Sequence, residues 1–434
     1  MAEPYFRSGP VTLYHGDCIE VMRTLPDASV HAVVTDPPYG LEFMGKDWDG
    51  ADGFRRSLNA ADAGRESVFG RTSKRAPEYN TGRGARVAQE RASELTEKGR
   101  GHSTSAGPYL AAGVDSIRVA GLPFQEWCAV WAAECLRVLK PGGYMLAFGG
   151  SRTWHRLSVA IEDSGFEIRD TIAWLYGSGF PKGTNLDGEF AGWGTGLKPA
   201  YEPIVVARKP LGQTVAASMA EHGTGAINIG ATRVGSGEGS RPRIAEASSE
   251  TRYTESGGTN FAPLPGVRGG SPEGRWPANV LLEQSQADAL DAETGILTSG
   301  TNAVRTKVGK FLEHGGLGKP GDVQTTYGDS GGASRYFPTF HYEAKAPGTE
   351  RPDVDGVQHP TVKPLDLMRW LVRLVASPGA VILEPFAGSG TTLEAAIGEG
   401  FDVIGIERDA TYLPLIMQRL DKPHEQTLDI EVTA

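Results

Sequence analysis

The sequence predicts an open α/β fold, with a mostly parallel, twisted sheet, helices on both faces and an irregular inserted region. Two strand-helix-strand patterns stand near the two ends of the 434-residue chain, over residues 11–35 and 380–407. Uncharged, β-branched strands such as 31–35 are typical of parallel sheets that are buried on both faces. The 58 glycines and 28 prolines indicate long loops around this core.

The first pattern is an apolar strand over residues 11–18, a helical stretch over 19–25 and a second strand over 31–35. In an open parallel sheet, ligands bind just beyond the carboxyl ends of the strands. Asp17 and Asp36 each stand at such an end, so both are candidates to face one crevice. Asp17 alone is equally well explained as a turn former.

Asp36-Pro37-Pro38-Tyr39 follows the second strand and is a candidate reaction site. The two prolines supply no N–H, so the local backbone carbonyls are held rigid and remain available as acceptors. Together with the Asp36 carboxylate, they could accept both hydrogens of an exocyclic amine such as adenine N6 and localise its lone pair for attack on an activated methyl. Tyr39 offers a flat face for stacking a base. Taken alone, the tetrapeptide is better explained as a capped turn at a strand end.

Composition restricts the class of protein. A content of 39% hydrophobic and 22% charged residues predicts a soluble globular chain. We expect no membrane span, because no apolar run reaches roughly 18 residues. Three cysteines, Cys18, Cys128 and Cys135, are too few for a disulfide framework or a metal site, so we expect a cytoplasmic protein without a metal. The net charge of −10 argues against unspecific coating of nucleic acid but allows a local basic surface.

Two stretches lack a periodic pattern. Residues 50–121 form an insert in which segment 54–100 has 11 Lys or Arg against 6 Asp or Glu. This charge fits a flexible basic loop on DNA phosphates, and a disordered linker is equally compatible with it. Residues 209–340 are rich in Gly, Ser and Thr, with aromatic-basic clusters such as 335–337, and are predicted to form a second, irregular region.

Regular elements stand between these stretches. Helical spacing of apolar residues predicts a core helix over residues 124–138, with Cys128 and Cys135 as packing residues. The elements expected after it are a strand over 144–148, a helix over 152–164, and strands over 167–175 and 203–207.

The second pattern is a strand over residues 380–384, a glycine turn over 385–390, a helix over 391–399 and a strand over 401–407. Gly388 and Gly390 would permit close approach of a ligand, and Glu407 would hold ribose hydroxyls. Glu384 would repel phosphate and attract a cation, so an adenosyl ligand with an ammonium and a sulfonium fits better than a dinucleotide. A purely structural turn remains an equal alternative at this point.

Four motifs, in their order, resemble those of the amino-group DNA methyltransferases. They are Asp36–Tyr39, Leu139–Gly143, His359–Pro364 and Glu384–Thr391. The catalytic motif comes first and the cofactor motif last, which resembles the permuted β group of that family. The resemblance covers about residues 10–45, 122–208 and 341–420. It implies a Rossmann-like methyltransferase fold with circularly permuted motif order, S-adenosylmethionine as cofactor and double-stranded DNA as substrate.

The resemblance also implies the site residues. Asp36, Pro37, Pro38 and Tyr39 would receive a flipped base. The residues expected around the cofactor are Asp17, Thr361, Lys363, Glu384, Phe386, Gly388, Ser389, Gly390, Thr391 and Glu407. Two features depart from the family pattern, because Glu384 stands where Asp is commoner and the insert 50–121 is unusually long.

The expected function is therefore site-specific methylation of adenine N6 in DNA, because Asp as the first tetrapeptide residue is commoner among the family's adenine enzymes. Methylation of cytosine N4 is the alternative, and a catalytically silent nucleic-acid-binding module is less well supported. The expected divisions are a catalytic half over 1–208, a target-recognition region over 209–340 and a cofactor half over 341–434. We expect a bacterial or phage-encoded protein; a homodimer and a cognate restriction endonuclease remain open.

Overall fold

A computed structural model of the chain divides into two compact units, which are described separately. Unit 1 comprises Met1–Ala173, Tyr201–Ile227 and Lys345–Ala434, and unit 2 comprises Trp174–Ala200 and Asn228–Ala344. The residues that the structure describes are 3–41, 49–50, 53–54, 56–58, 113–177, 179, 183–235, 242–243, 268–269, 274–298, 303–304, 323–324, 330–340 and 351–422.

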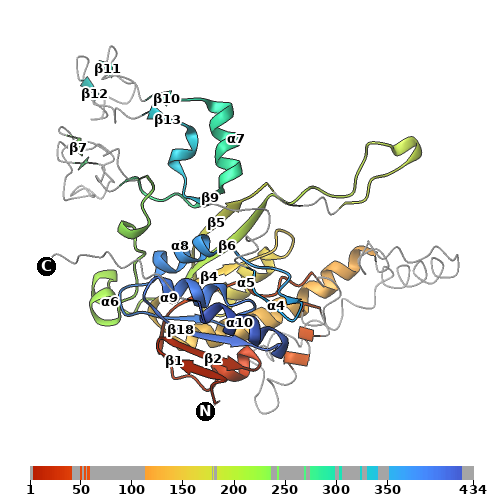
Figure 1. The fold of residues 1–434 in the computed structure, drawn as a ribbon, viewed down its shortest axis with the longest axis vertical. Helices are drawn as coiled ribbons and strands as arrows, with labels where there is room; N and C mark the ends of the chain where they lie inside the picture. Colours follow the sequence, from red (N-terminus) through yellow and green to blue (C-terminus); the bar gives the residue numbers. More distant parts are fainter. Residues whose placement is uncertain are drawn as a thin grey trace, which may run out of the picture. The chain divides into compact units, whose positions relative to one another are not determined.

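Unit 1 is built on a sheet with the strand order β1-β2-β18-β17-β3-β4-β6-β5 (Figure 1). The neighbours from β2 to β4 run parallel, whereas β1 and β6 run antiparallel to β2 and β4. This arrangement confirms the mostly parallel sheet. The strands are β1 (Phe6–Ser8), β2 (Val11–His15), β3 (Val30–Thr35), β4 (Leu139–Phe148), β5 (Glu167–Leu175), β6 (Tyr201–Arg208), β17 (Val381–Glu384) and β18 (Asp402–Glu407).

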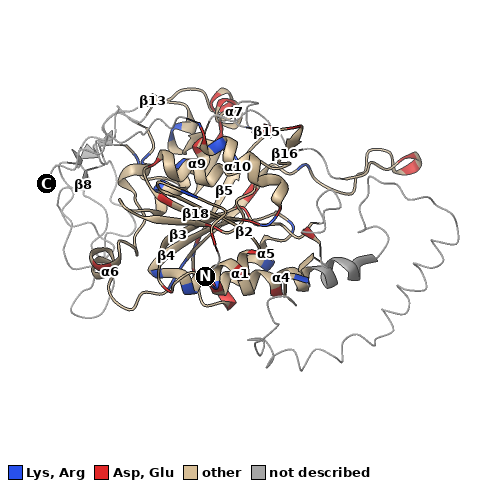
Figure 2. Ribbon diagram, turned by 60° about the horizontal axis from the view of Figure 1, so that its bottom comes forward, with Lys and Arg blue, Asp and Glu red and all other residues tan. Residues whose placement is uncertain are grey.

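Helices cover both faces of this sheet, as predicted, and Figure 2 shows the two layers. One layer holds α1 (Cys18–Met22), α4 (Gly113–Val138) and α5 (Trp154–Asp163). The other holds α8 (Leu365–Val375), α9 (Thr391–Gly398) and α10 (Leu413–Leu420). Apolar periodicity explains α8, since seven of its eleven residues are buried. Unit 1 also contains α6 (Val215–His222), η11 (Ala410–Tyr412), β15 (Asp353–Val354) and β16 (Val357–Gln358).

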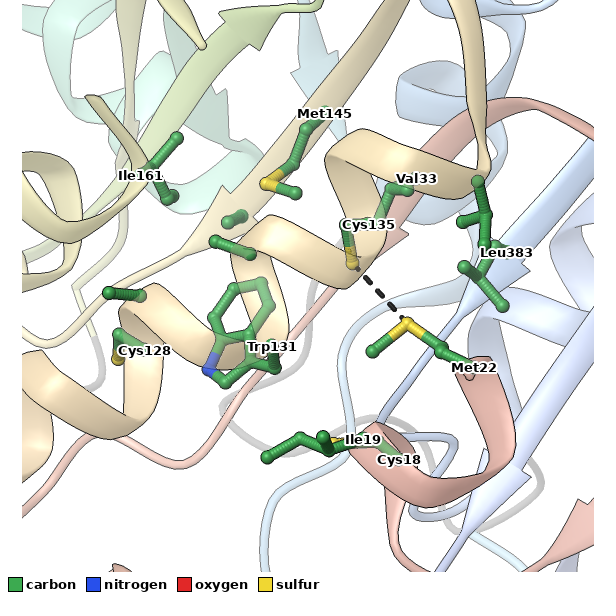
Figure 3. Packing of buried hydrophobic residues seen from close by; sticks show 14 of the residues in the cluster. Cys18, Ile19, Met22, Val33, Cys128, Trp131, Cys135, Met145, Ile161 and Leu383 are labelled. Carbon is green, nitrogen blue, oxygen red and sulfur yellow. Dashed lines mark hydrogen bonds between the residues drawn. The ribbon is translucent and has the colours of Figure 1, made fainter. Parts of the chain in front are cut away.

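The core of unit 1 lies between α4 and the sheet (Figure 3). The apolar residues predicted to line one face of the helix are all buried, including both of its cysteines. Cys135 Sγ lies 3.6 Å from Met22 Sδ of α1, within this cluster. The three cysteines are free and buried, which confirms the packing role predicted for Cys128 and Cys135.

Both ends of the insert 50–121 are more ordered than the sequence predicts. Residues 53–54 and 56–58 are helical, and Phe54 is buried with its ring centroid 4.7 Å from that of Trp127. At the other end, α4 begins as early as Gly113. The expectation of a structureless insert is therefore wrong at its ends, because Phe54 has an apolar site to fill. The basic segment 59–100 lies outside the described residues.

Unit 2 contains a parallel pair of short strands, β9 and β14, together with helix α7. Its boundaries differ from the expected recognition region 209–340. Unit 1 keeps α6, whose Ser218 Oγ donates to the Pro141 carbonyl, and residues 174–200 fall in unit 2. Its elements are η6 (Gly188–Phe190), η7 (Gly230–Thr232), β7 (Pro242–Arg243), β8 (Arg268–Gly269), β9 (Val280–Glu283), α7 (Gln284–Thr294), β10 (Leu297–Thr298), β11 (Ala303–Val304), β12 (Val323–Gln324), β13 (Ser330–Gly331), η9 (Ala333–Tyr336) and β14 (Thr339–Phe340).

Candidate active site

The candidate site residues gather at one edge of the sheet of unit 1. Strands β3, β17 and β18 are parallel neighbours, so Thr35, Glu384 and Glu407 all end strands at the same edge. Strand β6 runs in the opposite direction, so its first residues, Tyr201 and Glu202, also reach this edge. The two motifs that lie far apart in the sequence are thus adjacent in the sheet.

The carboxylate of Asp36 accepts a hydrogen bond at each oxygen. Tyr39 donates its hydroxyl hydrogen to Oδ1 over 2.8 Å, and Lys363 Nζ donates to Oδ2 over 2.5 Å. Lys363 is only 9% exposed in its side chain, and Asp36 is 20% exposed. The resemblance groups Lys363 with the cofactor residues, but the structure brings its ammonium to the catalytic tetrapeptide.

Glu202 completes this cluster, and the sequence did not identify it. Its Oε2 lies 3.2 Å from the Tyr39 hydroxyl oxygen, as an alternative acceptor to Asp36, and 3.3 Å from Lys363 Nζ. The Phe148 ring packs below the ammonium, with its centroid 4.8 Å from Nζ. An acid at the start of the apolar strand 203–207 was the available signal. The antiparallel direction of that strand, which brings the acid to the site, is not readable from the sequence.

Burial and charge fix the protonation of the two donors. Burial lowers the pKa of Lys363, but the carboxylates of Asp36 and Glu202 outweigh this effect and raise its pKa above the ordinary value. The pKa of Tyr39 is raised well above its ordinary value by burial first, and then by the same two carboxylates. At neutral pH, Lys363 is therefore an ammonium and Tyr39 a neutral phenol, so both can donate.

Backbone contacts hold the tetrapeptide loop. The Tyr39 carbonyl accepts from Thr153 Oγ1 at 2.7 Å, and the buried carboxylate of Asp49 accepts from the N–H groups of Gly40 and Leu41 at 2.6 and 3.0 Å. A side chain at Gly150 would place its Cβ 3.1 Å from the Tyr39 ring. Asp49 also went unnoticed in the sequence, where no pattern marks it.

Pro37 is buried and Pro38 is half-buried, and the carbonyl of each could accept a hydrogen bond from a ligand. Across the described residues, neither of them accepts a hydrogen bond. They therefore match the rigid acceptors that the sequence predicts beside Asp36.

The glycine turn lies between β17 and α9. Gly388 and Gly390 have φ angles of +52° and +79°, a left-handed conformation that glycine adopts without a steric penalty. Glu407 Oε2 accepts from Gly388 N, and Oε1 accepts from Asp409 N, each at 2.7 Å. Burial raises the pKa of Glu407 to about 7, although these backbone bonds oppose the shift. Glu407 thus ties the turn to the end of β18.

Glu384 points into the protein interior, where it is 1% exposed. Its carboxyl group accepts from Thr35 Oγ1 at 2.5 Å, Thr392 Oγ1 at 2.7 Å and Phe386 N at 3.0 Å. Burial raises its pKa to about 8 despite these bonds. From the sequence, this acid is expected to attract a cation, whereas its observed partners are a backbone N–H and two hydroxyl groups that connect the strand before Asp36 to α9.

The remaining expected residues have identifiable partners. Asp17 caps α1 through Ile19 N and also accepts from Ser57 Oγ at 2.8 Å. The half-buried ring of Phe386 lies 5.4 Å from the rings of both Trp127 and Trp131.

Three more of these residues stand at the turn, at the start of α9 and before α8. Ser389 Oγ lies 3.0 Å from Thr391 Oγ1, and the Ser389 carbonyl accepts from the fully buried Arg419. Thr361 is exposed, and its carbonyl is hydrogen-bonded to His359 Nδ1 at 2.6 Å. The buried guanidinium of Arg419 thus holds the turn through the Ser389 carbonyl, whereas Thr361 lies at the surface.

Two general properties concern the described part of the chain alone. Within it, no helix combines the length and apolar character needed to cross a membrane. The same residues contain no group of three or more His, Cys, Asp and Glu side chains arranged to hold a metal ion.

Known proteins resemble this chain in sequence. The type II methyltransferase M.HindIII of Haemophilus influenzae is 23% identical over 423 residues, which cover 94% of each chain. The DNA adenine methyltransferase YhdJ of Escherichia coli is 43% identical over 63 residues, which are 14% of this chain and 21% of the relative.

Solved structures are also similar. PvuII DNA methyltransferase, described as cytosine-N4-specific, aligns with a TM-score of 0.43 at 13% identity, over 98% of this chain and 91% of that one. The M1.HpyAVI–SAM complex aligns with a TM-score of 0.39 at 14% identity, over 95% of this chain and 100% of that one.

A family model described as DNA methylase, which represents the N6 and N4 methyltransferases, matches residues 120–418. This range covers most of α4 and the whole glycine turn, and together with residues 36–39 it contains every motif on which the resemblance depends. Since the match spans more than half of the chain, the protein belongs to this family of S-adenosylmethionine-dependent DNA amino-methyltransferases.

Proposed function

We propose that the protein methylates N6 of a flipped-out adenine in double-stranded DNA and that Asp36-Pro37-Pro38-Tyr39 is its catalytic loop. The observation that carries the proposal is the group of acceptors at the end of β3. The Asp36 carboxylate stands beside two proline carbonyls that accept no hydrogen bond within the described residues. The base must leave the duplex, because the amine cannot be reached in line while it is stacked and paired.

The loop would activate the amine by accepting its hydrogens. Asp36 would accept a hydrogen bond from one N–H of the amine, and a proline carbonyl would accept one from the other. The nitrogen lone pair would then no longer be delocalised into the ring. S-adenosylmethionine would supply a methyl carbon bonded to sulfonium, and the electron pair of the broken carbon–sulfur bond would stay on sulfur as the carbon–nitrogen bond forms. The methylated nitrogen would then release one proton to water, directly or by way of the Asp36 carboxylate. Asp36 is also placed to stabilise the positive charge that develops on nitrogen, as a carboxylate in a partly buried site.

The glycine turn fits the adenosyl cofactor. Gly388 and Gly390 add no side chains to it, and a Cβ at Gly388 would lie 3.0 Å from His359 Nε2. Glu407 uses one lone pair of each oxygen on a backbone N–H, so acceptor sites remain for ribose hydroxyls. We therefore assign the cofactor to Phe386, Gly388, Ser389, Gly390, Thr391 and Glu407. Asp17, Thr361 and Lys363 would close over it. Glu384 would support the turn from inside.

Adenine is favoured over cytosine by two observations. The first residue of the tetrapeptide is Asp, and one local sequence similarity, 43% identity over 63 residues, is to a DNA adenine methyltransferase. Cytosine N4 remains the second candidate, since its amine presents the same two hydrogens. The difference between the two products can be measured directly.

The direct test combines the purified protein, S-adenosylmethionine and DNA, followed by mass spectrometry of the released nucleosides. We expect N6-methyladenine, and modification-sensitive sequencing of the product should place it in one short sequence. N4-methylcytosine would transfer the assignment to the second candidate. Tight cofactor binding without any methylated base would support the silent binding module.

We further propose that residues of unit 2 contact DNA, in agreement with a recognition region within 209–340. Arg275 and Arg335 lie over the Tyr336 ring, with Cζ 5.2 and 4.4 Å from its centroid, and Arg233 lies 5.9 Å from that of Trp276. Trp276 is 68% exposed and Tyr336 is 44% exposed. An arginine beside an exposed aromatic ring combines a positive charge with a flat apolar face, and such a pair is suited to contacts with phosphates and bases.

This assignment predicts a selective loss in one of two exposed tryptophans. Trp276→Ala should weaken DNA binding by about 1–3 kcal/mol, the usual contribution of an aromatic ring in contact with bases. Trp193→Ala is the control, because Trp193 also belongs to unit 2 and is 71% exposed. Fluorescence anisotropy with labelled DNA would measure both variants. Equal affinities for the two would remove Trp276 from the interface.

A further inference from the structure

Asp36 has a conflict that the proposed chemistry must resolve. It should accept a hydrogen from the target amine, yet Tyr39 already donates to Oδ1 and Lys363 to Oδ2. A donated hydrogen draws electron density from the oxygen that accepts it. The amine is therefore polarised best when one of these donors has turned away from Asp36.

Tyr39 is a donor with a second carboxylate acceptor within hydrogen-bonding distance. A neutral phenol carries one hydrogen, so it can donate to only one acceptor at a time. Its oxygen lies 2.8 Å from Asp36 Oδ1 and 3.2 Å from Glu202 Oε2. Rotation about the C–O bond is enough to move the hydrogen from one carboxylate to the other.

We propose that Glu202 is a positioning residue for methyl transfer, because it receives the Tyr39 hydroxyl hydrogen when the target amine donates to Asp36. This inference rests on the catalytic role proposed for Asp36. It adds a second carboxylate, which touches neither of the reacting atoms but sets which acceptor is open to the amine.

Lys363 keeps both carboxylates next to a positive charge while the Tyr39 hydroxyl hydrogen moves from one to the other. Its ammonium lies between the carboxylates, 2.5 Å from Asp36 Oδ2 and 3.3 Å from Glu202 Oε2. An ammonium has three hydrogens and can bridge both acceptors throughout. The buried charge of Lys363 thus stays paired while Tyr39 changes its partner, so no buried ion is left alone.

The sheet holds Glu202 in place for this role. Strand β6 pairs with β4, with Ile204 opposite Phe148, and the Pro203 carbonyl accepts from Gly149 N at 2.9 Å. Glu202 stands directly before Pro203 in the chain, and its side chain is 22% exposed. Its backbone is therefore anchored, and its carboxylate lies at the rim of the site.

The test uses single-turnover methylation of DNA that carries the sequence modified by the native protein. Glu202→Gln keeps the shape but loses the charged acceptor, so we expect the rate to fall about 10- to 100-fold, the scale of a misplaced catalytic group. The dissociation constants for S-adenosylmethionine and DNA should stay within about twofold. Glu162→Gln, an exposed glutamate in α5, is the matched control and should leave the rate unchanged.

Coupling to Tyr39 separates positioning from a merely structural role. In a Tyr39→Phe background no hydroxyl hydrogen competes for Asp36, so Glu202→Gln should cost no more than about threefold there, a strongly non-additive result. An equal loss in both backgrounds would overturn the proposal, as would a native rate in Glu202→Gln.

If Glu202→Gln does not fold, Glu202→Asp provides the same comparison with a shortened acceptor and an expected intermediate rate. If the native protein methylates DNA and Glu202→Gln does so at the same rate, this inference is rejected and the proposed function is not. Absence of methylation by the native protein rejects the function on which it rests.

Discussion

The glycine turn and the Asp36 cluster lie at the same edge of one sheet but are assembled in opposite ways. The turn is local, because Gly388 N and Glu407, which hold it together, are 19 residues apart. The Asp36 cluster joins distant parts of the chain, since Lys363 is 327 residues from Asp36 and Glu202 is 163 residues from Tyr39. A local pattern can be read from spacing, whereas a cluster of this kind requires the fold.

The two regions also differ in their charge. Glu384 and Glu407 at the turn are almost fully buried and have raised pKa values, about 8 and about 7. Around Asp36, the ammonium of Lys363 lies between two carboxylates, which raise the pKa of this lysine. Burial without a cation favours the protonated acid, and burial with one preserves the charge. The first region suits a structural and binding role, and the second suits polarisation of a substrate.

The largest effect is expected from a substitution that breaks the Asp36 cluster and leaves the turn intact. Asp36→Ala removes the acceptor for the amine, so the methylation rate should fall by about 100- to 1,000-fold, as for other lost electrostatic contacts to a reacting group. Calorimetry should show nearly unchanged affinity for S-adenosylmethionine. Asp36→Asn, which keeps one acceptor, should retain partial activity. Undiminished turnover in the alanine variant would exclude Asp36 as the catalytic acceptor.

A smaller effect should appear when the turn is altered instead. Glu407→Ala removes the ribose acceptor, so the affinity for S-adenosylmethionine should fall by about 1.5–3 kcal/mol, the scale of a charge-assisted hydrogen bond. Calorimetry measures the loss, and circular dichroism establishes that the variant is folded. Glu407→Gln should lose less, because it keeps an acceptor. A folded alanine variant with native affinity would place the ribose elsewhere.

A third prediction concerns stability instead of catalysis or binding, and it distinguishes a buried neutral acid from an ionic one. The folded pKa of Glu384, about 8, lies above its ordinary value of 4.5. Below the ordinary value both states are protonated. Between the two values the unfolded chain releases the proton and the folded protein keeps it, so stability falls by up to about 1.4 kcal/mol per pH unit.

Glu384→Gln should remove this contribution. Urea denaturation from pH 5 to pH 7.5 should therefore show a weaker fall of the unfolding free energy in the variant than in the native protein. Glu162→Gln is again the exposed control and should leave the slope as it is. Parallel slopes for the native protein and Glu384→Gln would mean that Glu384 is ionised in the folded state.

The sequence predicts the parts of this fold that depend on local rules. Apolar runs and glycine positions were sufficient for β3, β17, β18, α9 and the core face of α4, and the parallel sheet followed from them. Phe54 was missed because a single aromatic residue in a polar stretch carries no periodic signal. Its site exists only after Phe124 and Trp127 are packed.

The sequence likewise predicted only the part of the site that is formed by contiguous motifs. The tetrapeptide and the turn are contiguous motifs, so Asp36 and Gly388 could be named in advance. Glu202 depends on β6 running antiparallel to β4, and strand direction is decided by the packing of the whole sheet. Glu384 was identified, but its burial between Thr35 and Thr392 was not, because side-chain direction at a strand end depends on the neighbouring strand.

The position of β3 in the sheet has a consequence for synthesis of the protein. Ile382 and Leu383 of β17 pair with Ala32 and Val33 of β3, so one side of β3 is completed only after almost the whole chain has been made. At typical translation rates, about 350 residues take on the order of tens of seconds. During that time the most apolar strand beside the catalytic loop is an unprotected edge. We expect nascent chains that stop before β17 to need chaperones and to aggregate readily, even though they already carry the complete tetrapeptide.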